Sequence, residues 1–164
     1  MGVSGSGKTT IGTALAARLD RVFAEGDDFH SAANVAKMTR GEPLTDADRE
    51  PWLAALAKWI ENHHRAGRPT VLACSALKRR YRETLRAAAP RHVVFIYLGA
   101  SRDVLLERMR HRKGHFMPPG LLDTQLAALE PLGADESGIT LDAAAAPAAL
   151  VERVLAALRT SNAD

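Results

Sequence analysis

The sequence predicts an α/β fold in which helices cover both faces of a parallel sheet. Short apolar runs alternate along the chain with longer segments of helical periodicity, and that alternation favours parallel strands joined by helices. The chain has 164 residues, of which 46% are hydrophobic and 25% charged, as in an ordinary globular protein. This length fits one domain with a proper core, so we expect residues 1–164 to form a single domain.

The apolar runs give the strands and the periodic segments give the helices. Strands are expected at 21–24, 70–73, 93–98 and 138–141, and helices at 8–19, 46–66, 76–88, 101–112, 119–129 and 147–159. Thr45 followed by Asp48 has the form of a capping box, which predicts a helix start at Asp46. Pro51 leaves open whether that helix begins there instead.

The most specific motif lies at the N-terminus. Residues Gly2 to Thr9 read Gly-Val-Ser-Gly-Ser-Gly-Lys-Thr and match the P-loop pattern G-x-x-x-x-G-K-[ST] in full. Glycines let backbone N–H groups converge on an anion, and the positive end of the next helix adds to the attraction. The predicted ATP-binding residues here are Gly2, Ser4, Gly5, Ser6, Gly7, Lys8, Thr9 and Thr10. Lys8 is expected to reach the β- and γ-phosphates, and the Thr9 hydroxyl to bind Mg²⁺.

A strand normally precedes the first glycine of a P-loop, but only Met1 stands there. That strand would be central and buried. We therefore expect a slot in the sheet unless another segment fills it, and a folded but inactive chain is one possible outcome.

Acidic residues follow the first expected strand. Glu25 and Asp27 lie at its carboxyl end, where open α/β sheets bind their ligands. A carboxylate there can accept the proton of a substrate hydroxyl or hold metal-bound water, although spacing alone fits an exposed acidic turn equally well. The run 70–73 ends in Cys74-Ser75, where many ATPases place an aspartate, and no N-K-x-D motif marks a regulatory GTPase.

Cations are the remaining candidates. Arg49 shares a helical stripe with Trp52 and Leu53, and a charge on an apolar stripe is costly unless it is paired, so Arg49 should point into a site. Lys78 and Arg82 form an i,i+4 pair that can present two cations to one anion. Arg108 and Arg112 precede a glycine- and proline-containing stretch, which suggests a lid at about 108–120 that brings arginines to the phosphates. Solvated helix faces are the alternative for all of these cations.

Composition limits the other possibilities. The single cysteine, Cys74, excludes an internal disulfide, and the chain has neither a signal peptide nor a long apolar run, so we expect a cytoplasmic protein without a membrane partner. Half of the 22 Lys and Arg residues fall between Lys78 and Lys113, which could indicate nucleic-acid binding. With only 5% aromatic residues to stack on bases, we expect no nucleic-acid partner.

Beyond the P-loop, several blocks of sequence resemble the gluconate kinase (gluconokinase) family, over roughly residues 2–142. They are Glu25-Gly-Asp-Asp-Phe-His30, Asn34, Lys37-Met38, Gly41-Glu-Pro-Leu44, Asp46-Ala-Asp-Arg-Glu-Pro-Trp-Leu53, Cys74-Ser-Ala-Leu-Lys78, Tyr81-Arg82, Leu85-Arg86 and Lys113-Gly-His-Phe-Met-Pro118. The Cys-Ser-Ala-Leu-Lys and Asp-x-Asp-Arg-x-Pro-Trp-Leu blocks are far more restricted than the P-loop. The resemblance implies a three-layer P-loop kinase fold, the cofactors ATP and Mg²⁺, and transfer of phosphate from ATP to gluconate.

The resemblance also implies roles for individual residues. Catalysis would use Lys8, Asp27 and Arg112; ATP binding would add Arg108 and Arg112; and Mg²⁺ would be held by Thr9 and Glu25. The substrate would contact Asp27, His30, Lys37, Arg49, Lys78, Arg82 and His115. A homodimer is implied as well. The nearest alternative is a P-loop kinase for another small acid, such as shikimate, adenylylsulfate or a nucleoside monophosphate.

Overall fold

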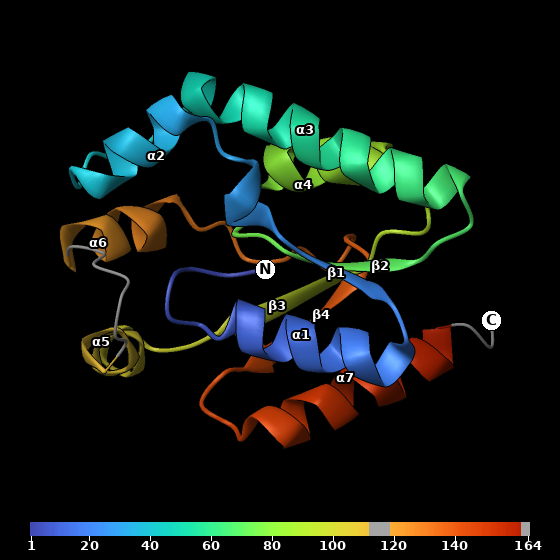
Figure 1. Ribbon diagram of the computed structural model, residues 1–164. Coiled ribbons are helices and arrows are strands. Elements are labelled where there is room, and N and C mark those ends of the chain that lie inside the picture. The colour runs from blue at the N-terminus through green and yellow to red at the C-terminus, as the bar shows by residue number, and fades with distance from the viewer. Residues whose placement is uncertain (112–118, 162–164) are drawn as a thin grey trace.

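The computed structural model of the protein describes residues 1–111 and 119–161 (Figure 1). Its elements are α1 (Lys8–Leu19), β1 (Val22–Glu25), the 3₁₀ turn η1 (Gly26–Phe29), α2 (Ala32–Thr39), α3 (Asp46–Arg65), β2 (Thr70–Ala73), α4 (Arg79–Ala87), β3 (Phe95–Gly99), α5 (Arg102–Arg110), α6 (Pro119–Ala128), β4 (Gly138–Asp142) and α7 (Pro147–Ser161). All predicted strands and helices are present, whereas α2 and η1 were not predicted.

Two helix starts show how local chemistry decides a boundary. The Thr45 hydroxyl accepts a hydrogen bond from the Asp48 amide, and the Asp48 carboxylate accepts one from the Thr45 amide, so the capping box is confirmed and α3 begins at Asp46. Pro51 is accommodated inside α3. Helix α4 begins three residues later than expected, because Ala76 has a positive φ of 43° and Lys78 is extended.

The strands form two parallel pairs, β1 with β2 and β3 with β4. Between the pairs lies the backbone of Met1 and Gly2. The Met1 amine donates to the Ile96 carbonyl at 2.5 Å, the Leu98 amide donates to the Met1 carbonyl at 3.0 Å, and the Gly2 amide donates to the Ser75 carbonyl at 3.1 Å. In the described residues the two pairs of strands are therefore separated by the width of one strand, which confirms the expected slot.

Helices cover both faces of the strands, which makes three layers (Figure 1). Helices α1 and α7 pack on one face through Ile11, Leu15, Leu150 and Val154, which are buried with Leu98 and Leu141 of the strands. Helices α3 and α4 cover the opposite face through Trp52, Leu56, Tyr81 and Leu85. No helix of the described residues has the length and apolar character needed to cross a membrane.

A third, smaller cluster lies at the carboxyl ends of the strands. It consists of Val3 from the P-loop, Leu77, Leu105 of α5 and Leu122 of α6, all at most 3% exposed. These contacts fix α5 and α6 against the P-loop, and they place the candidate site at the edge where open α/β sheets bind ligands.

Candidate active site

The P-loop turns through three glycines in conformations that other residues rarely adopt. Gly2, Gly5 and Gly7 have φ angles of 140°, 81° and 94°. Gly7 is the N-cap of α1 and supplies no side-chain cap, so the first turn of the helix is left for an anion. The Lys8 Nζ donates to the Val3 carbonyl at 3.1 Å, which lays the lysine across its own loop. This is the geometry of a phosphate cradle.

Helices α5 and α6 pack against the P-loop. A Cβ on Gly5 would come within 3.2 Å of the Leu105 carbonyl, so the loop packs directly on the α5 backbone. From α6, the Gln125 Oε1 accepts a hydrogen bond from the Ser4 amide at 2.7 Å. Gln125 was not predicted, because no motif in the sequence marks it and only the packing of α6 brings it to the loop.

The two residues assigned to the metal lie together. The Thr9 hydroxyl of α1 donates to Oε2 of Glu25, the last residue of β1, at 2.6 Å. A hydroxyl and a carboxylate are hard oxygen donors, and Mg²⁺ typically binds one or two protein oxygens together with phosphate oxygens and water. In the described residues no group of three or more His, Cys, Asp or Glu side chains could hold a metal alone. The donor set fits Mg²⁺ carried by a nucleotide.

His30 lies beside Asp27, just after β1. Its ring stacks on Trp52 with centroids 4.5 Å apart and an interplanar angle of 10°, and the Trp52 indole N–H donates to the Gly26 carbonyl at 2.7 Å. Burial lowers the pKa of His30, the charge of Asp27 acts against this shift, and the charge of Arg49 adds to it. His30 is therefore neutral near pH 7, and its buried Nδ1 has no hydrogen-bond partner in the described structure.

A pocket of about 290 Å³ opens beside the P-loop and is lined by Asp46, Arg49, Lys78 and Gln125, among others. The Lys78 Nζ contacts both Asp46 carboxylate oxygens, at 3.0 and 3.1 Å, and Arg80 and the Tyr81 hydroxyl bind the same carboxylate. These donors hold the pKa of Asp46 well below its usual range, with the Tyr81 hydrogen bond as the largest cause. Asp46 and Arg80 were not predicted to contribute here.

Arg49 differs from the other cations of this region. Its guanidinium lies 5.9 Å from the centre of the Tyr81 ring, a cation–π contact. No carboxylate of residues 1–111 and 119–161 makes a salt bridge with it, whereas Lys78 is paired with Asp46 and Lys37 with Asp48. Arg49 is also only partly exposed. A half-buried cation in this state is well suited to bind an incoming anion.

The structure corrects one predicted substrate contact. Arg82 is fully buried, and its guanidinium binds both carboxylate oxygens of Glu136 at 2.7 Å. It also donates to the carbonyls of Ala76, Leu77, Glu130 and Pro131. The i,i+4 spacing suggested that Arg82 and Lys78 face one anion, but Lys78 is the extended residue before α4 and Arg82 points into the core. Arg82 is structural.

The remaining candidate residues differ in their contacts. Lys37 forms a 2.7 Å salt bridge with Asp48, the capping residue of α3, which ties α2 to α3. Arg108 donates to the Ala143 carbonyl at 2.5 Å, at the carboxyl end of β4. Arg112, His115 and most of the expected lid lie outside the described residues.

Burial raises the pKa of the Cys74 thiol to about 11, so this cysteine is not a nucleophile.

Comparison with known proteins identifies relatives over most of the chain. A family model described as an AAA domain matches residues 1–132. The gluconokinase of Gluconobacter oxydans (strain 621H) is 48% identical over 155 residues, covering 94% of this chain and 86% of that protein.

Two solved structures extend the comparison. The crystal structure of a sugar kinase from Janibacter sp. HTCC2649 has a TM-score of 0.92 and 52% identity, covering 97% of this chain and 91% of the other. The structure of a gluconokinase from Sinorhizobium meliloti 1021 has a TM-score of 0.89 and 46% identity, covering 98% and 89%. With a complete P-loop, the cations beside it and this similarity over nearly the whole length, the chain belongs to the gluconokinase family of P-loop kinases.

Proposed function

We propose that this protein transfers the γ-phosphoryl group of ATP to the terminal hydroxyl of D-gluconate and forms 6-phospho-D-gluconate. The observation that carries the proposal is the position of Arg49, a half-buried cation without a salt bridge in the described residues, in a pocket whose wall residue Gln125 also binds the P-loop. An acidic small molecule held there would lie next to the phosphates of ATP.

The P-loop binds ATP. Its amides and the N-terminus of α1 contact the phosphates, and Lys8 moves from the Val3 carbonyl to the transferring group, where its charge offsets the charge that develops. Mg²⁺ would be held by Thr9 and Glu25 and would neutralise negative charge on the phosphate oxygens. Arg108 and Arg112 are proposed to reach the nucleotide when the site closes.

Gluconate has a carboxylate at one end, a primary hydroxyl at the other and a polyol between. In our proposal Arg49 binds the carboxylate, because Lys78 is already paired with Asp46 and Arg82 with Glu136. Lys78 and neutral His30 then bind hydroxyl groups, with Lys37 and His115 as further contacts. In this assignment the hydrogen bonds set the orientation of the substrate, and the charge of Arg49 selects an acidic substrate.

Asp27 is proposed as the general base. It is exposed at the carboxyl end of β1, two residues after Glu25, which contacts the P-loop helix through Thr9. A carboxylate in that position can accept the proton of the terminal hydroxyl while the oxygen attacks the γ-phosphorus in line with the leaving ADP.

Three further expectations belong to this proposal. The protein assembles as a homodimer, functions in the cytoplasm and binds neither nucleic acid nor membranes. Light scattering after size-exclusion chromatography tests the dimer, and a mass of one chain across the micromolar range would refute it. Titration with labelled RNA and DNA at low salt tests the nucleic-acid expectation, since a basic patch that bound nucleic acid would give a steep salt dependence.

A coupled assay of ADP release over a panel of acids tests the activity. The panel contains gluconate, shikimate, adenylylsulfate and a nucleoside monophosphate, each with ATP and Mg²⁺. We expect turnover with gluconate. Turnover of another acid and none of gluconate would replace this proposal with the corresponding small-acid kinase.

The Arg49 assignment has its own test. Arg49→Met removes the charge at similar length, and the loss of a charge-assisted hydrogen bond should raise KM for gluconate roughly 10- to 100-fold with little change in KM for ATP. Arg18→Met is the matched control, because Arg18 pairs with Glu152 on the α1–α7 face away from the pocket. An unchanged gluconate KM in Arg49→Met would show that another cation binds the carboxylate.

A further inference from the structure

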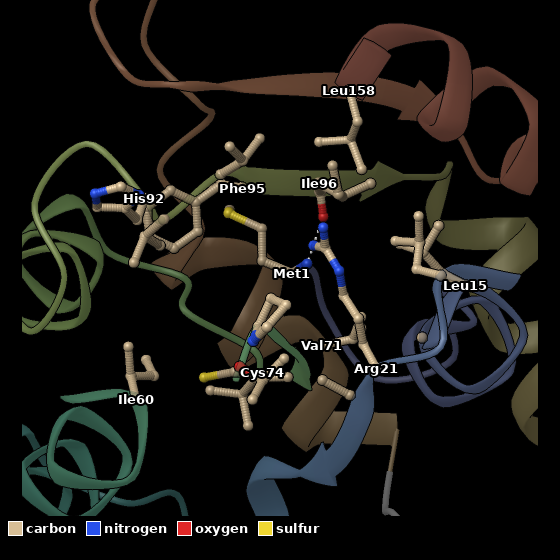
Figure 2. Close-up of a pocket in the computed structure, with 18 of the residues that line it drawn as sticks. Met1, Leu15, Arg21, Ile60, Val71, Cys74, His92, Phe95, Ile96 and Leu158 are labelled. Atoms are coloured by element: carbon tan, nitrogen blue, oxygen red, sulfur yellow. Dashed lines mark hydrogen bonds between the residues drawn. The ribbon is translucent and has the colours of Figure 1, made fainter. Parts of the chain in front are cut away.

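Helix α6 lines the pocket beside the P-loop and not the larger cavity in the slot between β2 and β3. The larger cavity has a volume of about 780 Å³, and Figure 2 shows Val71, Ile96 and Leu158 among the side chains that line it. None of the described residues that line it belongs to α6. The pocket of about 290 Å³, where an acid is proposed to bind, has four α6 residues in its wall.

These four residues form one stripe of the helix, since they are spaced three and four apart. They are Leu121, Thr124, Gln125 and Ala128. A second stripe packs on the P-loop through Leu122, which is 0% exposed and lies in one cluster with Val3. At about 3.6 residues per turn, Gln125 is the pocket residue nearest to that second stripe. Gln125 is thus placed between the pocket and the loop.

One hydrogen bond fixes the Gln125 side chain to the loop. Its Oε1 accepts from the Ser4 amide at 2.7 Å. Only the oxygen of a side-chain amide can accept from an N–H group, so this contact also determines which way the amide is turned. The nitrogen, Nε2, carries two N–H donors. Gln125 can therefore hold the loop with one atom and donate to a ligand with the other.

The same peptide group joins Gln125 to Lys8. The N–H of the Val3–Ser4 peptide donates to Gln125, and the carbonyl of this peptide accepts from the Lys8 Nζ at 3.1 Å. No described peptide bond is cis, and a trans peptide is a rigid plane whose N–H and carbonyl point in opposite directions. A rotation of this plane would move both contacts at once. The contact with Gln125 therefore helps to set the position of the carbonyl that holds the Lys8 ammonium.

The pocket also calls for a neutral hydrogen-bond donor. Its cations are already assigned, because Lys78 is paired with Asp46 and Arg49 is proposed to bind the carboxylate of the acid. A polyol offers hydroxyl oxygens along its length, and a side-chain amide can donate to one of them without adding charge. Gln125 has this chemistry.

We propose that Gln125 contacts the bound acid and positions the P-loop at the same time. Its Nε2 donates to a hydroxyl oxygen of the acid, and its Oε1 holds the Val3–Ser4 peptide and thereby Lys8. This inference rests on the proposed function, which makes the acid gluconate. Because acid and nucleotide then depend on one ordered side chain, each should bind more tightly when the other is present, and by the same factor.

Two variants separate the two contacts of Gln125. Gln125→Met removes both the donor and the acceptor at similar length. Gln125→Glu keeps an acceptor for the Ser4 amide but replaces the donor with a second oxygen. Asp123→Asn is the matched control, because Asp123 lies on the exposed side of α6 and pairs with Arg102.

Three measurements follow these contacts. Hydrogen exchange of the Ser4 amide reports the contact with the loop and needs no ligand. Steady-state kinetics give kcat and the KM for gluconate. Calorimetric titration with a non-hydrolysable ATP analogue and Mg²⁺, with and without gluconate, gives the coupling factor, which is the ratio of the two Kd values.

In wild type, saturating gluconate should tighten binding of the analogue roughly fivefold or more. Gln125→Met should speed exchange of the Ser4 amide by at least about fivefold, raise the gluconate KM roughly 3- to 10-fold, lower kcat and bring the coupling factor close to one. Gln125→Glu should keep the Ser4 amide protected and kcat closer to wild type, yet raise the gluconate KM at least as much, because a carboxylate repels the acid. Asp123→Asn should match wild type.

A wild-type gluconate KM together with an unchanged coupling factor in Gln125→Met would overturn the proposal and leave Gln125 as a support of the loop alone. Unchanged exchange of the Ser4 amide in that variant would overturn it as well. If Gln125→Met does not fold, Gln125→Glu decides: a raised gluconate KM with a protected Ser4 amide supports the proposal, and a wild-type KM refutes it.

Failure of the proposed function would look different. Wild type would then turn over another acid of the panel and not gluconate, whereas exchange of the Ser4 amide would be unaffected. The KM and the coupling factor are in that case measured with the acid that is turned over, and the same results decide for or against Gln125.

Discussion

Replacement of Arg82 by methionine separates a structural arginine from a substrate-binding one. Arg82 is 0% exposed and Glu136 is 5% exposed, and the guanidinium contacts both carboxylate oxygens at 2.7 Å. Methionine preserves most of the aliphatic packing but leaves the buried Glu136 carboxylate with one partly exposed cation, Arg86 at 3.3 Å, and the Gly133 amide at 3.0 Å. We expect Arg82→Met to lower stability without altering the affinity of the folded protein for gluconate.

The magnitude follows from the pair itself. Hydrogen bonding to Arg82 is the main cause that lowers the pKa of Glu136 from 4.5 to about 2, and such a shift corresponds to about 3 kcal/mol. Breaking a buried pair from one side generally costs about 3–5 kcal/mol, because the remaining charge is uncompensated. Both considerations give a loss of about 3 kcal/mol or more, which is a large fraction of the stability of a small domain.

Urea unfolding at pH 7 measures this loss, with Arg79→Met as the control. Arg79 forms exposed salt bridges with Glu83 and Asp135, which water screens, so its loss should lower stability far less than the loss of Arg82. The Glu136 contribution is present above pH 4.5 and is lost as the pH falls towards 2, so wild type and Arg82→Met should converge in acid. A variant of unchanged stability with a raised gluconate KM would refute the reasoning and return Arg82 to the substrate site.

Three further predictions follow from local contacts. Thr45→Ala should lower the free energy of unfolding by about 1 kcal/mol in urea titration, because the capping box with Asp48 is lost; an unchanged value would mean that the cap is dispensable. Burial, together with the charge of Lys8, lowers the pKa of the Met1 amine from 8.0 to about 5, so protonation favours the unfolded chain and the urea midpoint should fall as the pH drops from 8 to 5; N-terminal acetylation should flatten that slope. Gly26→Ala would place a Cβ 2.6 Å from the Ala73 carbonyl, so thermal denaturation should occur at lower temperature and kcat should fall as β1 shifts; wild-type values for both would contradict the clash.

Local patterns in the sequence were sufficient to predict the P-loop and most of the strands and helices. Glycine at positions 2, 5 and 7 is typical of a tight anion-binding turn, so the P-loop could be placed in advance. Thr9 and Glu25 were both assigned to Mg²⁺ from the sequence, but the hydrogen bond between them was seen only in the structure. Each expected strand and helix was likewise found, since apolar periodicity and the Thr45 cap act over a few residues. Helix α2 was missed although Ser31 caps it, because its eight residues are too short for a clear period.

The roles of residues whose partners lie far along the chain became clear only in the folded structure. Lys78, Arg82 and Arg49 were all expected to contact the substrate. In the structure Arg82 is buried in the core with Glu136, 54 residues away, and Lys78 is paired with Asp46, 32 residues away. Arg49 is singled out by its lack of such a partner in the described structure. The depth of the slot between β2 and β3 also depends on how two helical layers close over it. Motifs reveal which chemistry is present, whereas the pairing of charges and the closing of cavities depend on distances that only the folded chain sets.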